Sequence, residues 1–502
     1  MKVIFHELGT AFFSMICVVF LICTASPVSD VLADSMNDVV KSSSNVASKA
    51  FDTNYKYYSK LELAVEDANN LTTKNSDTDR LQAEAGLEIK NGKAYIILYR
   101  NTNDTETLNI TNDTNISLNN KTLNMKNGCN INTNDNLQIY NGVVNISESN
   151  RGIYPQNIDS QTNITNVKYN FSATSTPKGT YALVGTSSIK INKCDINMQI
   201  ENSTKSTAII LVRSNINLDI SNSTINQVVH GTPSTFGIAI TSDSNINLTN
   251  NNMYIKSNAG STIGIYIQSK TNITINSGSY RNNNGAALYS CNKDSNITIH
   301  GGKFSTNYYN TTSPGIVNVG TLTIDENKGS VYVCGRNSAI QLNEGSKNYI
   351  NGGTFESPQH GGIYCCSGSA GHTEINGGTF KNIGGSVNGW NTAYSFGAAY
   401  FGCANNTKAA WHIDVKNAKF VNEWGDHGIV QKSNNGYIPP SINLYNTYIS
   451  GKGDDINIQN NDSVKLYNAY VNLYAGTVLE HNKIRDYYAD GHNGESFVKD
   501  YR

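Results

Sequence analysis

The chain of 502 residues is long enough for several globular domains, but only 15% of its residues are charged and 38% are hydrophobic, with 42 Gly and 8 Pro. This composition excludes a coiled coil, a collagen and a charge-rich disordered chain. Lys and Arg (38) balance Asp and Glu (39), so the net charge of −1 predicts no basic surface for nucleic acid or for an anionic membrane.

The N-terminus has the features of an export signal. An apolar run over 11–25 follows Lys2, and Val31-Leu32-Ala33 supplies the small residues that a signal peptidase needs. We therefore predict a signal peptide over 1–33 and a mature chain from Asp34 that is secreted or held at the cell surface. The alternative is an uncleaved anchor, because the apolar part has about the minimum length that spans a bilayer.

The next segments predict a lead-in and a helical cap. Residues 34–54 are polar and poor in aromatics, which is typical of a flexible lead-in. Four apolar residues between 55 and 70 fall on one face at helical spacing: Tyr58, Leu61, Val65 and Ala68. A short amphipathic helix is therefore expected there, within an N-terminal cap over 55–93. From residue 94 onward the pattern changes to short alternating runs that are typical of β-strands.

The alternating part of the sequence is a repeat. An apolar residue recurs five positions before a second apolar or aromatic one, in the pairs Leu118/Leu123, Ile139/Val144, Ile164/Tyr169, Ile191/Ile196, Ile220/Ile225, Leu248/Met253, Ile275/Tyr280, Ile299/Phe304, Ile350/Phe355, Ile375/Phe380, Val415/Phe420, Leu444/Ile449 and Leu466/Val471. Ile324 fits the same register, but Gly329 stands at its second place. The intervals average roughly 27 residues, and a further short strand such as 265–267 lies between successive pairs.

Such short strands cannot bury a face alone, but they can when each turn of the chain stacks on the next. The expected fold is therefore an all-β parallel β-helix over 94–479, with alternate residues pointing inward and a C-terminal cap or tail over 480–502. A propeller would need four longer strands in each unit, and leucine-rich repeats would show Leu at fixed spacing with a helix. Neither pattern is present.

Some of these repeats resemble a known family. The segments 271–276, 295–304 and 374–380 resemble the coils of right-handed parallel β-helix proteins of the pectate-lyase-like superfamily. The segment 115–123 is similar to the first coil of bacterial secreted and surface β-helix proteins of adhesin type, where it follows a capping helix. The resemblance implies a right-handed solenoid. It leaves the function open, because the superfamily contains polysaccharide lyases, glycoside hydrolases, phage tailspikes and adhesins.

The residue directly before the first member of each pair should face solvent. In two neighbouring coils this residue is acidic. Glu374 and Asp414 would lie about 5 Å apart at Cα, with His372 and His412 two residues earlier on the same face. This arrangement suits a general acid and base pair with the histidines assisting, or a divalent cation such as Ca²⁺, and no other cofactor is expected. The alternative is a polar ladder without chemistry.

The chain between Ile375 and Val415 is longer than the other intervals and rich in aromatic residues. A long loop on a rigid scaffold is where binding residues concentrate, and aromatic faces stack against sugar rings. The predicted ligand-binding residues are Tyr364, Trp390, Tyr394, Tyr400, Trp424 and His427. A further exposed stack is predicted on the second strand of the coils: Tyr266, Tyr289, Tyr364 and Tyr400.

Two short motifs resemble pieces of the polygalacturonases, which share this fold. They are Gly453-Asp454-Asp455 and Gly425-Asp426-His427-Gly428. Their order is the reverse of the family's and no matching basic motif accompanies them, so the resemblance carries no activity over to this chain.

The sequence leaves functions of different classes open. The favoured one is a secreted or cell-surface protein that binds a polysaccharide, a cell-surface glycan or another surface partner. The alternative is a polysaccharide hydrolase or lyase that uses Glu374 and Asp414, and a third hypothesis is a structural spacer. No nucleic acid partner is expected, and a membrane is a partner only if the signal stays uncleaved.

Overall fold

The computed structural model describes residues 54–176, 179–231, 234–258, 261–307, 313–343, 345–365, 371–384, 397–402, 411–425, 427–433, 440–460, 471–488 and 498–502. The predicted signal peptide and nearly all of the predicted lead-in lie outside these residues, as do Trp390 and Tyr394. Within the described ranges, no helix combines the length and the apolar character that a bilayer crossing needs.

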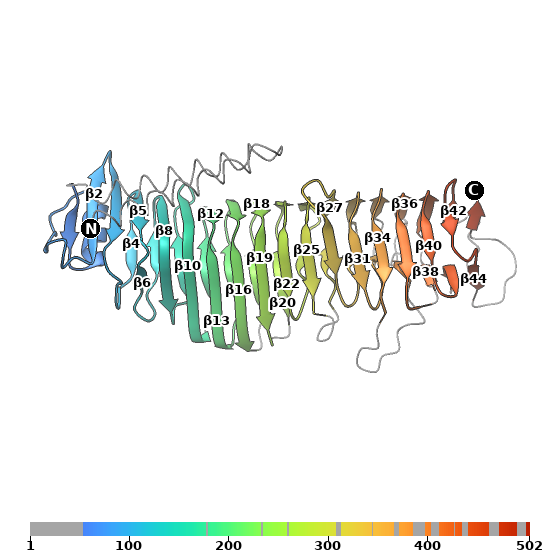
Figure 1. Cartoon of the computed structure of the whole chain (residues 1–502), viewed down its shortest axis with the longest axis horizontal. Coiled ribbons are helices and arrows are strands. Elements are labelled where there is room, and N and C mark those ends of the chain that lie inside the picture. The colour runs from blue at the N-terminus through green and yellow to red at the C-terminus, as the bar shows by residue number, and fades with distance from the viewer. Residues whose placement is uncertain are drawn as a thin grey trace, which may run out of the picture. The chain divides into compact units, whose positions relative to one another are not determined.

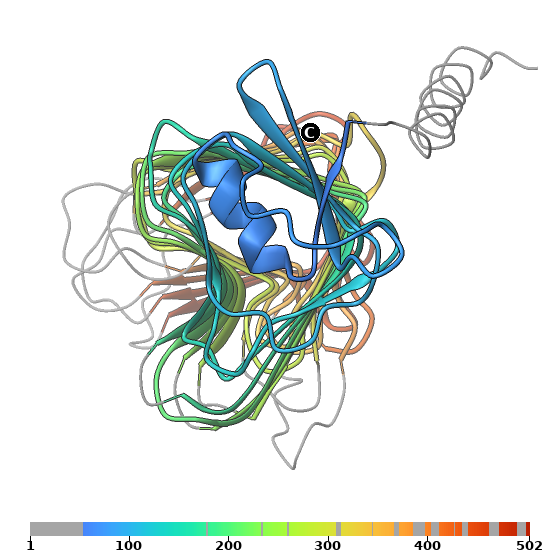
Figure 2. The same cartoon turned by 90° about the vertical axis from the view of Figure 1, so that its left-hand side faces the viewer.

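The unit formed by Lys56–Arg502 begins with a small cap. Its antiparallel strands are β1 (Lys56–Tyr58), β2 (Ala85–Lys90) and β3 (Lys93–Leu98). Between β1 and β2 lies α3 (Leu61–Asn69), which confirms the predicted short amphipathic helix for Leu61, Val65 and Ala68, whereas Tyr58 lies in β1. The buried side chains of Leu61, Ala64, Val65 and Ala68 join the apolar core, and the helix lies across the N-terminal end of the coils (Figure 2).

The remaining strands form three series, and strands of one series pair in parallel from coil to coil (Figure 1). The first series consists of β5 (Thr114–Ser117), β12 (Ser188–Asn192), β15 (Asn217–Ser221), β18 (Ser244–Thr249), β21 (Thr271–Ile275), β24 (Asn296–Ile299), β27 (Thr321–Ile324), β30 (Lys347–Ile350), β33 (His372–Ile375), β36 (His412–Lys416), β39 (Ser441–Tyr445), β42 (Val471–Leu473) and β45 (Val498–Asp500). The second series consists of β6 (Thr122–Asn124), β13 (Asp195–Ser203), β16 (Thr224–Gly231), β19 (Asn251–Ser257), β22 (Gly278–Asn282), β25 (Gly302–Thr306), β28 (Val331–Cys334), β31 (Thr354–Ser357), β34 (Thr379–Asn382), β37 (Lys419–Asn422), β40 (Tyr448–Ser450) and β43 (Val478–Leu479). Two long strands, β8 (Leu137–Ser147) and β10 (Gln161–Thr176), run through both of these series. The third series consists of β4 (Leu108–Ile110), β7 (Ile131–Thr133), β9 (Arg151–Pro155), β11 (Thr180–Gly185), β14 (Thr207–Val212), β17 (Thr235–Ile240), β20 (Thr262–Ile267), β23 (Leu288–Ser290), β26 (Ile316–Asn318), β29 (Ile340–Leu342), β32 (Ile363–Cys365), β35 (Ala399–Gly402), β38 (His427–Ser433), β41 (Asp454–Asn460) and β44 (Ile484–Tyr488).

This arrangement confirms the predicted all-β parallel solenoid. In the described part of the chain, the first and second series belong to one sheet of 30 strands and the third series forms a sheet of 15. Successive register partners in the first series are Ile164, Ile191, Ile220 and Leu248. These partners are buried in one continuous apolar core that extends over all three series. The apolar pairs of the repeat are therefore the inward-facing residues of stacked coils.

Two of the predicted pairs, and the coil of Ile324, differ from the observed register. The first coil uses Ile116 instead of Leu118 as the partner of the next coil. The coil of Ile324 has a longer turn and uses Val333 in the second series. Val471 lies in the first series rather than the second, and its predicted partner Leu466 lies outside the described residues. In the first coil the difference is two residues, which keeps the same side chains on the inner face, so alternation alone does not determine the pairing.

The turn from the first to the second series needs a left-handed backbone. Asn166 and Asn222 have φ values of 53° and 51° at this turn, whereas Gly353 and Gly378 of later coils have φ values of 113° and 103°. Asn tolerates this conformation because its short polar side chain bonds locally, and Gly has no Cβ to clash. This requirement explains the Asn and Gly that recur in the sequence repeat.

Asparagine side chains also form a ladder on the outer face of the second series. Its members are Asn124, Asn145, Asn170, Asn197 and Asn226. From Asn145 onward, each Nδ2 donates to Oδ1 of the preceding asparagine, at distances of 2.7 to 3.2 Å. The ladder therefore links neighbouring coils by side-chain hydrogen bonds in addition to the backbone ladder.

The position of an asparagine within this ladder should determine its contribution to stability. Asn170→Ala removes two hydrogen bonds and is expected to lower the free energy of unfolding by about 2 kcal/mol. Asn226→Ala, at the end of the ladder, removes one and should cost about 1 kcal/mol. Urea unfolding of both variants checks the difference, and equal losses would contradict it.

Candidate functional site

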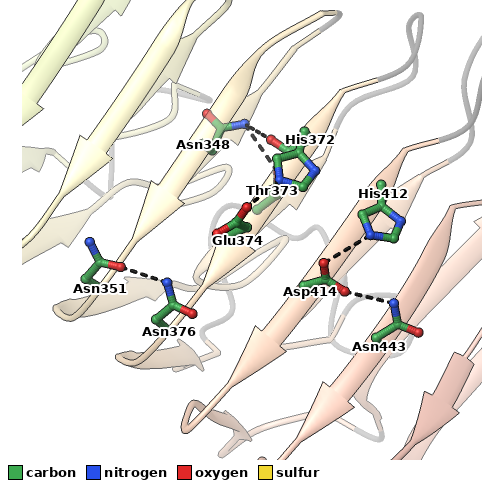
Figure 3. Close-up of polar contacts among 9 residues, drawn as sticks. All are labelled: Asn348, Asn351, His372, Thr373, Glu374, Asn376, His412, Asp414 and Asn443. Atoms are coloured by element: carbon green, nitrogen blue, oxygen red, sulfur yellow. Dashed lines mark hydrogen bonds and ion pairs between the residues drawn. The ribbon is translucent and has the colours of Figure 1, made fainter.

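The four predicted catalytic residues lie side by side on the outer face of β33 and β36 (Figure 3). The two strands pair so that His372 is opposite His412 and Glu374 is opposite Asp414. They face outward because they alternate along the strands with buried residues such as Thr373. The register predicted from the repeat therefore places these residues correctly.

Each histidine bonds to the carboxylate of its own coil. His372 Nε2 lies 2.7 Å from Glu374 Oε1, and His412 Nε2 lies 3.0 Å from Asp414 Oδ2. The two imidazole rings stack with their centroids 5.6 Å apart and their planes at 6°. Asn443 Nδ2 donates to Asp414 Oδ1 at 2.8 Å, so both oxygens of this carboxylate accept a partner (Figure 3).

This patch is open to solvent. The exposed fraction of the four side chains ranges from 28% for Asp414 to 49% for His412. A catalytic acid and base pair needs one carboxyl group whose pKa is raised, and burial is what raises it. An open strand face buries such a group only weakly. Ca²⁺ prefers six to eight oxygen ligands. Among the residues that the structure describes, no group of three or more His, Cys, Asp and Glu side chains is placed to hold a metal ion.

The predicted tyrosine stack lies on the outer face of the third series. Successive register partners from β17 to β38 are Ala239, Tyr266, Tyr289, Val317, Gln341, Tyr364, Tyr400 and Val430. We call this set the tyrosine column. The four predicted tyrosines therefore do share one column, but Val317 and Gln341 divide them into two pairs.

Further aromatic rings extend both pairs of the tyrosine column. Phe236 stacks on Tyr266 with the ring centroids 4.9 Å apart, and the Tyr266 and Tyr289 centroids are 6.2 Å apart. In the second pair, Tyr364 and Tyr400 stack at 4.9 Å and 24°. His360 lies 4.7 Å from Tyr364 and 6.2 Å from Tyr400. All of these rings are partly exposed, so the face presents apolar area together with phenol hydroxyls.

The electrostatics of the column favour uncharged rings. Burial lowers the pKa of His360 from its ordinary value of 6.5 to about 4, because the charged imidazolium would lose its water. Burial, and secondly a hydrogen bond with Cys291, raises the pKa of Tyr266 to about 12. Both side chains are therefore neutral near pH 7.

The other predicted ligand-binding residues lie apart from this column. Trp424 is 51% exposed in the turn between β37 and β38, with Lys452 Nζ 5.5 Å from its ring centroid. His427 is only 4% exposed, and its Nε2 lies 2.6 Å from Asn457 Nδ2. Trp424 is therefore accessible to a ligand, whereas His427 is enclosed by its neighbours.

The two motifs that resemble polygalacturonase pieces meet in space. His427 and Asp454 are register partners, with His427 Nδ1 3.3 Å from Asp454 Oδ2. Arg485 Nε lies 3.1 Å from the same oxygen. Asp455 is fully buried and accepts the backbone N–H of His481 at 2.9 Å. These contacts link residues at or near the starts of β38, β41 and β44 in successive coils, which is a structural role.

Sequence reasoning missed three residues of this surface. Val317 and Gln341 could have been found by carrying the register of Tyr289 onward to the strands at 316–318 and 340–342. His360 has no such signal, because it lies in a turn before β32 and only packing brings it onto Tyr364.

The fold and the surfaces described above are known from the sequence and the structure of this chain alone. Comparisons with protein families, with curated proteins and with solved structures found no match to this chain.

Proposed function

We propose that this protein is a secreted or cell-surface solenoid that binds a glycan along the tyrosine column. The proposal depends on the stack of His360, Tyr364 and Tyr400. Their rings are partly exposed, and the ring centroids lie 4.7 to 6.2 Å apart. Aromatic rings offer apolar area that packs against the C–H groups of a sugar, and phenol hydroxyls can bond its hydroxyls.

The scaffold supports binding of an extended chain. Neighbouring coils are about 4.8 Å apart, so a polysaccharide laid along the coil axis meets a new side chain of the column at each coil. Continuous backbone ladders link β20, β23, β26, β29, β32 and β35. A platform held in this way loses little conformational freedom when a ligand binds, which favours affinity.

The proposal includes the cellular location of the protein and its fold family. The predicted signal peptide over 1–33 supports export to the surface or the medium. The coil sequences support a right-handed solenoid of the pectate-lyase-like superfamily, resembling its surface adhesins. Carbohydrate ligands are frequent in that superfamily, which agrees with a glycan as the partner.

Removal of the best-formed aromatic pair should weaken glycan binding. The double variant Tyr364→Ala/Tyr400→Ala is expected to raise the dissociation constant at least tenfold, because truncated aromatic anchors typically cost more than about 1 kcal/mol each and 1.4 kcal/mol is tenfold. The glycan is first identified on an array of polysaccharides with the purified protein. Calorimetry then measures its affinity for the wild type and the variant.

A matched control lies on the first series. Tyr445 and Tyr474 form a partly exposed stack with centroids 4.3 Å apart, and their double alanine variant should bind as the wild type does. Loss of affinity in this control alone would move the site to the first series. Release of products from the bound glycan, abolished in Glu374→Gln/Asp414→Asn, would instead establish a polysaccharide hydrolase or lyase.

A further inference from the structure

The tyrosine column is interrupted over two coils, where Val317 and Gln341 stand between Tyr289 and Tyr364. A depression of about 190 Å³ lies beside this interruption and is lined in part by Tyr289, Val317 and Gln341. The depression therefore extends over the coils of β20, β23, β26 and β29, beside Tyr289 and the two residues that interrupt the column.

The described residues that line the depression are apolar or polar and carry no charge. Tyr289 supplies an aromatic ring, and Ile263 and Pro314 supply further apolar surface. Asn284 and Gln341 supply amide groups, and hydroxyls of Ser and Thr complete the lining. None of the described residues that line it has an acidic or basic side chain.

Size and charge together limit what can occupy this space. A volume of about 190 Å³ is below the range of roughly 300 to 1,000 Å³ that holds drug-sized ligands, so it fits one ring rather than several. A carboxylate or sulfate would lose its water here without gaining a charged partner, at a cost of several kcal/mol. The hydroxyls of a neutral sugar find amide and hydroxyl partners instead. Gln341 is already oriented, since its Nε2 donates to Asn343 Oδ1 at 3.0 Å.

A second hollow on the solenoid has the opposite character. It measures about 370 Å³ and is lined by Lys270, Lys293 and Lys347 together with Asp294. This contrast shows that the uncharged lining beside Tyr289 is a local property and not a general one of the surface.

We propose that the depression beside Val317 is a subsite for one neutral sugar ring, which packs against Tyr289 and bridges the interruption of the column. The ligand is then a neutral polysaccharide that lies along the coil axis, with neighbouring sugars over Tyr266 and Tyr364. This inference rests on the glycan binding proposed above and adds the class of sugar and its place.

The variant Val317→Tyr tests the subsite by filling it. Val317 lines the depression but is itself only 2% exposed, so the larger ring of a tyrosine has to extend into the depression, and the affinity for the glycan should fall at least tenfold. Thr323→Tyr is the matched control, because it adds the same side chain on the same coil but on the first series, beside Tyr349. Its affinity should equal that of the wild type.

A second variant keeps the test decisive if Val317→Tyr fails to fold. Tyr289→Ala removes the aromatic ring without adding volume and should also weaken binding at least tenfold. Calorimetry with hexasaccharides of neutral glucan, mannan and chitin, and with a charged hexasaccharide of galacturonate, measures each affinity. Circular dichroism verifies the fold of each variant.

The outcomes separate this inference from the proposed function. Wild-type binding that is lost in Tyr364→Ala/Tyr400→Ala but kept in both Val317→Tyr and Tyr289→Ala would overturn the subsite and leave glycan binding intact. Preference for the galacturonate hexasaccharide over every neutral one would also overturn it. Binding of no glycan at all would remove the proposed function together with the subsite.

Discussion

The variant Phe380→Ala is expected to lose about 3–5 kcal/mol of the free energy of unfolding. Phe380 is fully buried between two parallel rings of neighbouring coils, Phe355 at 4.7 Å and 16° and Phe420 at 5.0 Å and 20°. The backbones on both sides are held at strand spacing by β31, β34 and β37. The space left by the ring therefore cannot close, and both aromatic contacts are lost.

Phe304 provides the control for this loss. It is also fully buried in the second series, but it stacks on one aromatic ring, Tyr280, at 5.0 Å, while its partner in the next coil is Val333. Phe304→Ala should therefore cost about 0.5–1.5 kcal/mol less than Phe380→Ala. Urea unfolding, with hydrogen exchange to locate the coils that open, measures both losses. A loss below about 1.5 kcal/mol for Phe380→Ala would contradict the packing described here.

The stability of the protein should fall between pH 6.5 and pH 4 because of His360. Its pKa is about 4 in the folded chain and 6.5 when unfolded, so the unfolded chain binds more protons in this window. Stability is therefore fully present above pH 6.5 and is lost as the pH falls through the folded pKa. At about 1.4 kcal/mol per pKa unit, the loss amounts to about 3 kcal/mol.

The variant His360→Phe isolates this effect from other titrating groups. Phenylalanine keeps a ring against Tyr364 and Tyr400 but takes up no proton. The difference in unfolding midpoint between wild type and variant should therefore change between pH 7 and pH 4, with the wild type losing more. Parallel curves for the two proteins over this range would refute the contribution of His360. Because His360 supports the tyrosine column, glycan affinity should weaken over the same range.

The sequence repeat predicted which residues of neighbouring coils lie opposite each other. Glu374 lies opposite Asp414, and His372 opposite His412, as the spacing indicated. What the repeat did not contain is the bonding within each coil, where each histidine bonds to its own carboxylate. Side-chain rotamers decide that bonding, and they depend on neighbours that a one-dimensional pattern does not describe.

The sequence by itself determined the fold class of this protein. Strand periodicity is a local property, and residues that alternate along a short strand show which face is buried without knowledge of the neighbouring coil. The length of the repeat recurs along the chain, and none of the short strands buries its face alone. Equivalent strands of successive repeats therefore have to stack. The short cap helix followed from the same kind of local evidence, since Leu61, Val65 and Ala68 of the predicted face lie in α3, although Tyr58 lies in β1.

Only the tertiary structure decided which side chains form the surface of the proposed binding site. The enclosed position of His427, the ring of His360 on Tyr364 and the depression beside Val317 all depend on turns whose length varies from coil to coil. Turn geometry brings together side chains from coils separated by 20 to 30 residues or more, as with Ile263, Tyr289 and Gln341. Such contacts leave no period in the sequence, because each occurs once and results from the packing of several coils.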